Sequence, residues 1–253
     1  MIVNRSILIT GATGKVGSTL TAHFLAQADK VIAVSRSQEA LDALASKQQR
    51  AGRLYTIAAD LMASDACQTI TDALSTMELT PDGLVNNARS ISFLGIESSG
   101  QVRRENFMNE FQLDVIAPYE LTMALARMQG SRLTSVVNIG SQYGIVAPNL
   151  KLYEDPARQS PIHYGVAKAA LAHLTKELAV RLAEQHIRVN CVAFGGVEGR
   201  VNPAFKARYA ELCPSGRMLR EDELPGPVDL LLSEAASAIT GHVMMADGGW
   251  SLW

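Results

Sequence analysis

The sequence lacks the features that mark several classes of protein. Its 253 residues include only three cysteines, an odd number without CxxC spacing, so we expect free thiols, no disulfide framework and no metal site. The formal net charge of −2 gives no basic excess of the kind that nucleic-acid binding needs. No apolar run approaches the roughly 20 residues that cross a bilayer. The expected partner is therefore a small molecule, and neither a nucleic acid nor a membrane.

The bulk composition is that of an ordinary globular protein. Apolar residues make up 47% of the chain and charged residues 19%, which is enough for a good core. The length suits one large domain and is short for two. Residues 1–5 lead directly into a strand-like run, without the regions of a signal peptide. We therefore expect a cytoplasmic protein.

Short β-branched runs alternate with longer helical patterns along the whole chain. The expected strands are 6–10, 31–34, 54–58, 83–85, 135–139, 188–193 and 242–246. The expected helices are 15–28, 37–50, 64–77, 102–129, 164–185 and 228–238. Most strands are continuously apolar, as parallel strands covered on both faces are. This pattern predicts one α/β domain over residues 1–253: a doubly wound Rossmann fold with a seven-stranded parallel sheet and helices on both faces.

A glycine-rich turn joins the first expected strand to the first expected helix. Its glycines let the backbone approach a ligand closely, and the helix N-terminus offers free N–H groups to a pyrophosphate. At the first strand–helix turn of an α/β chain, this pattern indicates a dinucleotide site. The residues assigned to cofactor binding here are Gly11, Thr13, Gly14, Lys15, Val16 and Gly17.

The end of the second strand bears on the choice of cofactor. An acidic residue there favours the ribose 2′-hydroxyl of NAD, whereas an arginine favours the 2′-phosphate of NADP. The sequence has Ser35, Arg36 and Ser37 at this point and no acid. Arg36 suits a phosphate, and Lys15 would add a second cation. We predict a preference for NADP(H), with NAD(H) as the alternative.

A tyrosine and a lysine four residues apart open the long expected helix 164–185. This spacing puts Tyr164 and Lys168 on one helix face, one turn apart. A neighbouring ammonium stabilises a phenolate, so a tyrosine beside it can exchange a proton with a substrate hydroxyl. Ser141 follows the strand 135–139, at the strand end where ligands bind in open sheets. These three residues are the predicted catalytic group of an oxidoreductase.

With these motifs, the chain resembles the short-chain dehydrogenase/reductase family over nearly its whole length. The matching residues are Thr10–Gly17, Asp60-Leu61, Asn86-Asn87-Ala88, Ser141, Tyr164 with Lys168, Arg188-Val189-Asn190 and Asp247-Gly248-Gly249. The resemblance implies hydride transfer between a nicotinamide dinucleotide and an alcohol or ketone, acting on CH–OH groups. It also implies a homotetramer or homodimer.

The resemblance assigns further roles by position. It implies that Asp60 and Leu61 flank the adenine, and that Asn87 braces the sheet with Ala88 near the ribose. Lys168 would also hold the nicotinamide ribose hydroxyls. The backbone of Val197 would bind the carboxamide.

Three positions depart from the family pattern. Arg89 replaces the usual glycine after Asn-Asn-Ala, and would either bind an anionic substrate or point to solvent. Asp114 stands where the family often has a catalytic asparagine, and beside Lys168 it would raise the pKa of the lysine. Phe194 replaces the usual proline, and would restrict the nicotinamide pocket or simply pack. These departures motivate a second hypothesis: a cofactor-binding protein with little turnover that acts as a sensor or assembly partner.

Two irregular stretches, the insert 144–163 and the substrate loop 195–225, are expected beside the active site. They resemble a bacterial subgroup linked to flagellin modification and surface sugars, which implies a sugar-type or polyol substrate. Cations in the loop would bind a phosphorylated sugar or, with the neighbouring acids, form a solvated surface. They are Arg200, Lys206, Arg208, Arg217 and Arg220. His163 is expected at the surface, without a chemical role.

Overall fold

The computed structural model describes residues 5–27, 29–48, 51–199 and 201–253. The expectations for residues 1–4 and for Arg200 lie outside the described residues, as do the expected helix ends at 28 and 49–50. No helix in the described ranges is long and apolar enough to span a membrane. All three cysteines are free.

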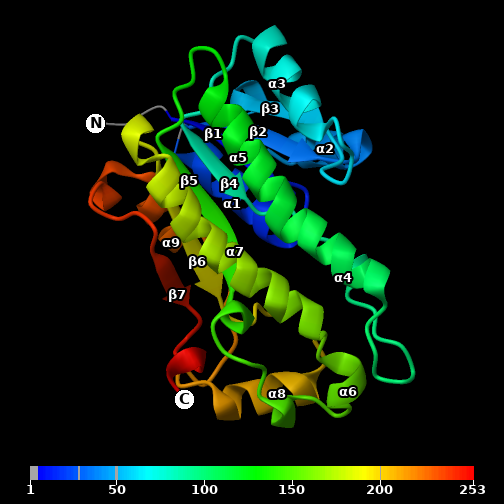
Figure 1. Cartoon of the computed structure of the whole chain (residues 1–253). Coiled ribbons are helices and arrows are strands. Elements are labelled where there is room, and N and C mark those ends of the chain that lie inside the picture. The colour runs from blue at the N-terminus through cyan, green and yellow to red at the C-terminus, as the bar shows by residue number, and fades with distance from the viewer. Residues whose placement is uncertain (1–4, 28, 49–50, 200) are drawn as a thin grey trace.

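The sheet has seven strands, and every neighbouring pair is parallel (Figure 1). The strands are β1 (Ser6–Thr10), β2 (Lys30–Ser35), β3 (Leu54–Ala58), β4 (Gly83–Asn86), β5 (Ser135–Ser141), β6 (Arg188–Phe194) and β7 (Val243–Ala246). Their order is β3-β2-β1-β4-β5-β6-β7. The predicted fold class is confirmed. The strand order reverses between β1 and β4, and ligands of open α/β sheets bind outside the carboxyl ends of the strands at such a point.

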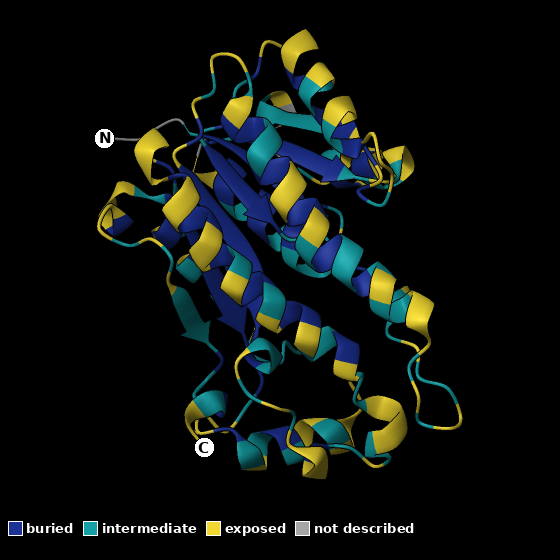
Figure 2. Cartoon of the chain, in the orientation of Figure 1, coloured by how far each residue is buried: buried dark blue, intermediate teal, exposed yellow. Residues whose placement is uncertain are grey.

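Helices cover both faces of the sheet because alternate strand residues face opposite ways. Leu8 packs in one core with α3 (Ala66–Thr76), α5 (Ala117–Arg127) and α7 (Ile162–Arg181). Its neighbours Ile7 and Ile9 pack in the other core with α1 (Lys15–Ala26), α2 (Gln38–Ser46) and α9 (Pro225–Leu232). Figure 2 shows the resulting layer of buried strands between partly exposed helices.

The expected helix 102–129 is a composite. It consists of α4 (Arg104–Phe111), a single π-helical segment Gln112–Ile116, and α5. Such π-turns inside α-helices are frequent at functional sites. Asp114 lies within this one, so the irregularity falls on a predicted catalytic position.

Two helices lie in the stretches expected to be irregular: α6 (Pro156–Gln159) and α8 (Pro203–Leu212). The side chain of Asn202 caps α8 by accepting from the Phe205 amide at 2.7 Å, and Pro203 occupies its first turn. Tyr209 is the only fully buried residue of α8, so the helix has no apolar stripe for a sequence pattern to detect. A third, smaller core joins α8 to the insert and the C-terminal segment. Its buried members are Leu152, Tyr209, Cys213, Met218 and Trp250.

Candidate active site

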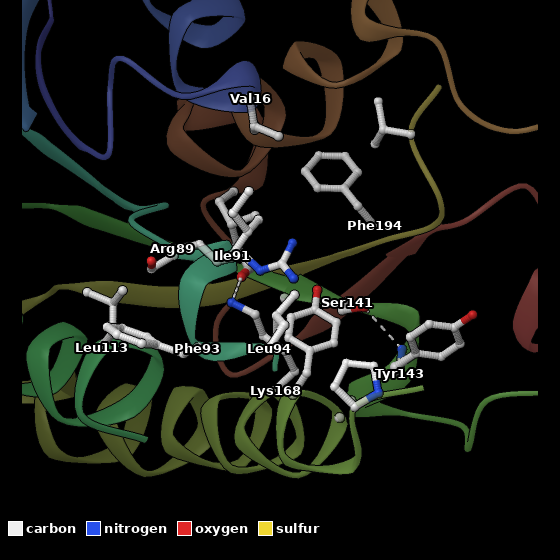
Figure 3. Close-up of a pocket in the computed structure, with 18 of the residues that line it drawn as sticks. Val16, Arg89, Ile91, Phe93, Leu94, Leu113, Ser141, Tyr143, Lys168 and Phe194 are labelled. Atoms are coloured by element: carbon white, nitrogen blue, oxygen red, sulfur yellow. Dashed lines mark hydrogen bonds between the residues drawn. The ribbon is translucent and has the colours of Figure 1, made fainter. Parts of the chain in front are cut away.

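A cavity of about 1240 Å³ opens at the carboxyl ends of the strands. The glycine turn, the ends of β2, β4, β5 and β6, and the start of α7 all contribute to its lining. Figure 3 shows Ser141 from β5 and Lys168 from α7 within this site, with Val16 and Phe194 across from them. Most of the residues predicted for cofactor binding and for catalysis therefore line one cavity, and the exceptions are Gly17 and Asp114.

The glycine turn has the geometry of a pyrophosphate cradle. Gly11 has φ of +62°, and a Cβ on it would lie 2.7 Å from the Cα of Ala88. A Cβ on Gly17 would collide with the Gly11 carbonyl oxygen, so only glycine allows this packing. Gly14 begins α1 without a side-chain cap, which leaves the first N–H groups of the helix to an anionic ligand. The predicted dinucleotide fits this turn.

Asn87 ties the glycine turn to β4, as the family resemblance implied. Its side-chain amide donates to the carbonyl oxygens of Thr10 at 2.9 Å and Gly11 at 3.2 Å. The Thr10 hydroxyl accepts from the backbone amides of Asn87 and Ala88, each at 3.0 Å. These contacts hold the end of β4 against the floor of the cradle.

The end of β2 presents Arg36 to the cavity as an exposed side chain. Beside it, the hydroxyls of Ser35 and Thr13 are hydrogen-bonded at 2.8 Å. Asp60 and Leu61 also line the cavity, with Leu61 buried and Asp60 exposed. This is the arrangement expected around an adenosine.

Lys15 was expected to be a second phosphate-binding cation, but in the structure it is paired with a carboxylate. Its Nζ lies 3.2 Å from Oε1 of Glu221, in the substrate loop. Lys15 also lines the cavity, so it remains a candidate cofactor residue. A ligand phosphate would have to compete with the Glu221 carboxylate for it.

Tyr164, Lys168 and Ser141 converge at the end of β5. Nζ of Lys168 lies 5.9 Å from the centre of the Tyr164 ring and donates to the Ile139 carbonyl oxygen at 3.0 Å. Ser141 is buried, and its hydroxyl accepts from the Tyr143 amide at 3.2 Å. The segment that follows β5 packs closely against α7, and this packing depends on Gly144, where a Cβ would lie 2.7 Å from the Lys168 carbonyl carbon.

Asp114 forms a buried ion pair with Lys168. Its Oδ2 lies 3.0 Å from the Lys168 Nζ, and the two side chains are 1% and 6% exposed. Burial is the largest single effect on the pKa of Lys168 and lowers it, but the charge of Asp114, the charge of Tyr164 and the hydrogen bond to Asp114 together outweigh burial, so the pKa lies above the ordinary value. The expected ion pair is present, and the catalytic role of Asp114 stays a prediction.

The other two departures, Arg89 and Phe194, line the cavity. The guanidinium carbon of Arg89 lies 4.3 Å from the centre of the Tyr164 ring, so the side chain lies over the proposed catalytic phenol. Phe194 is buried in the sheet–helix core, as the packing alternative predicted, and it also lines the cavity, so a restriction of the nicotinamide pocket stays a prediction. Arg89 is thus positioned to act on whatever binds at Tyr164.

His163 is buried, and the expectation of a surface residue was wrong. Its Nε2 is hydrogen-bonded to the Phe93 carbonyl oxygen at 2.7 Å, and its ring lies 5.8 Å from that of Phe107 in α4. Helix α7 begins at Ile162 rather than 164, which places His163 in its first turn beneath α4. Helix packing, rather than a loop, determines its surroundings.

The cations of the substrate loop form a mixed-charge surface. Their ion pairs in the described part of the chain are Lys206–Glu198 at 2.7 Å, Arg208–Glu154 at 3.4 Å, Arg217–Glu223 at 2.7 Å, Arg220–Asp222 at 3.1 Å and Arg220–Glu223 at 3.5 Å. The loop lines the cavity with Val201, Phe205 and Met218 instead. The structure therefore favours the solvated-surface interpretation over a cationic lid.

Tyr209 and Gln142 are site residues that the sequence did not indicate. The Tyr209 hydroxyl donates to Gln142 Oε1 at 3.1 Å and accepts from the Gly196 amide at 2.9 Å. Its ring stacks on Trp250 with centroids 4.4 Å apart. Through Tyr209, α8 holds the backbone beside Val197, which lines the cavity.

The fold and the site define an NAD(P)-binding oxidoreductase with a Rossmann fold. A family model described as "Enoyl-(Acyl carrier protein) reductase" matches residues 11–251. The chain belongs to the short-chain dehydrogenase/reductase family.

Relatives and solved structures match the chain along its whole length. The post-translational flagellin modification protein A of Campylobacter coli is 25% identical over 100% of both chains. An NAD+-bound short-chain dehydrogenase from Leptospira borgpetersenii is 28% identical with a TM-score of 0.86, over 98% of this chain and 93% of the other. The RhlG/NADP complex of Pseudomonas aeruginosa is 26% identical with a TM-score of 0.87, over 98% and 97%.

Proposed function

We propose that this chain transfers a hydride between NADP(H) and a secondary alcohol or ketone, with Tyr164 as the acid/base. The observation that carries the proposal is that Tyr164, Lys168 and Ser141 line the same cavity as the glycine cradle. A protein that only bound the nucleotide would not need a buried lysine beside a tyrosine at the strand ends.

Each residue has a definite task in this proposal. The nicotinamide, when bound, supplies or accepts the hydride. Ser141 hydrogen-bonds the substrate oxygen, and Tyr164 gives that oxygen a proton during reduction or removes it during oxidation. Lys168 replaces the proton on the tyrosine and holds the nicotinamide ribose. The backbone of Val197 binds the carboxamide.

The lining of the cavity bears on the substrate. Near Tyr164 it is largely apolar, and its apolar members include Ile91, Phe93, Leu94, Ile145, Phe194 and Phe205. Such a surface favours a carbonyl compound with an apolar substituent. The family model is described as an enoyl-(acyl carrier protein) reductase, whereas a flagellin modification protein is among the relatives and belongs with the subgroup from which the sequence predicted a sugar-type substrate. We propose the apolar class, and the sugar-type or polyol substrate stays the competing prediction.

A panel of carbonyl compounds tests the activity and the substrate class together. We expect NADPH oxidation with aliphatic ketones, and kcat/KM rising with chain length. Three further buried methylenes contribute about 2.4 kcal/mol, or roughly 50-fold. The loss of absorbance at the reduced-nicotinamide band measures the rate of NADPH oxidation and, across the series of ketones, the dependence of kcat/KM on chain length. Turnover confined to aldoses and ketoses would reverse the assignment of the substrate class.

Arg36 makes a separate prediction about the cofactor. We expect NADPH to bind at least about tenfold more tightly than NADH, equivalent to about 1.4 kcal/mol, because the guanidinium binds the 2′-phosphate. In the variant Arg36→Ala this preference should disappear while NADH affinity stays the same. Fluorescence titration measures both affinities, and Arg127→Ala, an exposed arginine on α5, is the matched control. Equal affinity of the unmodified protein for the two nucleotides would contradict the role of Arg36.

The second candidate is a cofactor-binding protein with little turnover. The position of Arg89 is the observation in its favour, because its guanidinium lies over the Tyr164 ring. Tight nucleotide binding without oxidation of NADPH by any carbonyl compound would favour this candidate. The cytoplasmic location and the homotetramer or homodimer stay predictions in either case.

A further inference from the structure

Arg89 is a cation in the proposed active site to which the proposed reaction gives no task. Its side chain is exposed, lines the cavity and reaches over Tyr164, with the guanidinium carbon 4.3 Å from the ring centre (Figure 3). A contact with a ring face leaves the N–H donors of a guanidinium without a conventional acceptor. Among the described residues, Arg89 has neither an ion pair nor a side-chain hydrogen bond. Its donors are therefore available to a ligand.

The other described cations that line the cavity have a partner or a proposed task. Lys168 is paired with Asp114, and Lys15 is paired with a carboxylate of the substrate loop. Arg36 follows β2 and is assigned to the 2′-phosphate of the cofactor. Arg89 is thus the cation that the described lining leaves for a substrate.

The buried acid whose charge interacts with Arg89 does not neutralise it by contact. Glu110 of α4 is 1% exposed, and neither of its carboxylate oxygens has a hydrogen-bond partner among the described residues. Burial and the charge of Asp114 raise the pKa of the Glu110 carboxyl to about 7, and the charge of Arg89 lowers it by a smaller amount. Glu110 therefore carries only part of a negative charge at neutral pH, and the guanidinium is left with a net positive charge.

The backbone on both sides of Arg89 is anchored. The amide of Ala88 donates to the Thr10 hydroxyl at 3.0 Å. Ser90 caps the short helical turn that follows, where its hydroxyl accepts from the Ser92 amide at 3.3 Å. The hydroxyls of Ser90 and Ser92 are also hydrogen-bonded to each other at 2.6 Å. A ligand that pairs with Arg89 meets a side chain whose backbone is already fixed, which reduces the entropic cost of binding.

We propose that Arg89 binds a carboxylate of the substrate, an inference that rests on the proposed hydride-transfer function and narrows its substrate class to oxo acids. A guanidinium pairs bidentately with a carboxylate, and one cation balances its single charge. A phosphate ester carries nearly two charges, for which the described lining offers no second available cation. Because Arg89 lies over Tyr164, whose phenol must contact the substrate oxygen, the carboxylate lies only a few bonds from the reacting carbonyl. The apolar substituent then lies against the apolar lining.

A pair of substrates that differ in charge tests the proposal. 2-Oxohexanoate and its methyl ester have the same reacting carbonyl and the same aliphatic chain. In the variant Arg89→Ala, the ratio of kcat/KM for the acid to kcat/KM for the ester should fall on the order of ten- to hundredfold, the usual effect of losing a charged hydrogen-bonded pair. Comparing this ratio between the two proteins cancels the different intrinsic reactivities of the acid and the ester. The KM for NADPH should not change.

Two further variants make the comparison specific. Arg89→Lys keeps a positive charge without the planar fork, so its acid-to-ester ratio should lie between those of the unmodified protein and Arg89→Ala. Arg127→Ala, at an exposed position outside the cavity lining, should match the unmodified protein. An acid-to-ester ratio that Arg89→Ala leaves unchanged would overturn the proposal and leave the hydride-transfer function intact. If the KM for NADPH rises instead, Arg89 is a ligand of the cofactor.

Binding of an unreactive carboxylate gives a readout that does not depend on turnover. Hexanoate has no ketone, and hexanamide has nearly the same shape without the charge. In a ligand-detected NMR titration of the NADPH-saturated protein, Arg89→Ala should weaken the binding of hexanoate by a similar factor and leave that of hexanamide unchanged. Equal affinity of the two proteins for hexanoate would overturn the carboxylate site. If no carbonyl compound is reduced, the hydride-transfer function fails, and this titration alone decides whether Arg89 forms a carboxylate site.

Discussion

Replacing Tyr164 by phenylalanine should reduce kcat by roughly 10²- to 10⁴-fold, the usual contribution of a positioned general acid. Phenylalanine keeps the ring and its packing but removes the only atom that gives the substrate its proton. The ring also lies beneath Arg89, 4.3 Å from the guanidinium carbon, and this contact survives the substitution. NADPH affinity should therefore change little. Stopped-flow measurement of hydride transfer, with a fluorescence titration of NADPH, separates the two effects.

Tyr119→Phe is the matched control for this experiment. Tyr119 lies on α5 and is 45% exposed, away from the residues that line the cavity. It should keep full activity. Tyr164→Phe with more than a tenth of the original kcat would contradict the role of the phenol as the acid/base.

Replacing Lys168 by methionine should damage both activity and stability. The stem of the side chain is preserved, but Asp114 is left 1% exposed without its cation. Breaking a buried ion pair in this way costs about 3–5 kcal/mol in the free energy of unfolding. Loss of the ammonium that recharges Tyr164 should also lower kcat by on the order of 10²-fold or more. Urea denaturation and steady-state kinetics measure the two effects separately.

The double variant Lys168→Met with Asp114→Asn distinguishes the cause of the lost stability from the cause of the lost activity. Removing the orphaned charge should restore part of the lost stability, whereas activity should stay low because no ammonium is present. Lys176→Met, at an exposed position of the same helix, should change stability by less than about 0.5 kcal/mol. Equal stability of Lys168→Met and the unmodified protein would show that the ion pair does not form in solution.

Local sequence patterns were sufficient to predict the strands of the sheet. All seven strands were predicted because each is a short apolar run, although only the five inner strands are buried almost throughout and the edge strands β3 and β7 are partly exposed. Helix α8 was missed because its single buried residue, Tyr209, leaves no periodic stripe, and the caps at Asn202 and Pro203 become meaningful only once the helix is seen. His163 was misplaced for a related reason, since its burial comes from α4 and not from its own helix.

The proposed catalytic group could be predicted only in part. The four-residue spacing of Tyr164 and Lys168 follows from helix geometry, and the position of Ser141 follows from the end of a strand. The ion pair of Lys168 with Asp114 was predicted only through the family resemblance, because the two residues belong to helices far apart in the sequence. No pattern indicated that Glu110 would lie unpartnered beside them.

The sequence by itself determined the parallel sheet, the glycine cradle at the start of α1 and the placement of a tyrosine and a lysine on one helix face. Each of these depends on a local repeat or on the backbone freedom of glycine, which a short segment carries with it. Only the tertiary structure decided that Lys15 pairs with Glu221, that Arg89 lies over Tyr164 and that Asp114 forms a buried ion pair with Lys168. Those charges interact through space, and the packing of separate helices and loops sets their distances and their exposure to water.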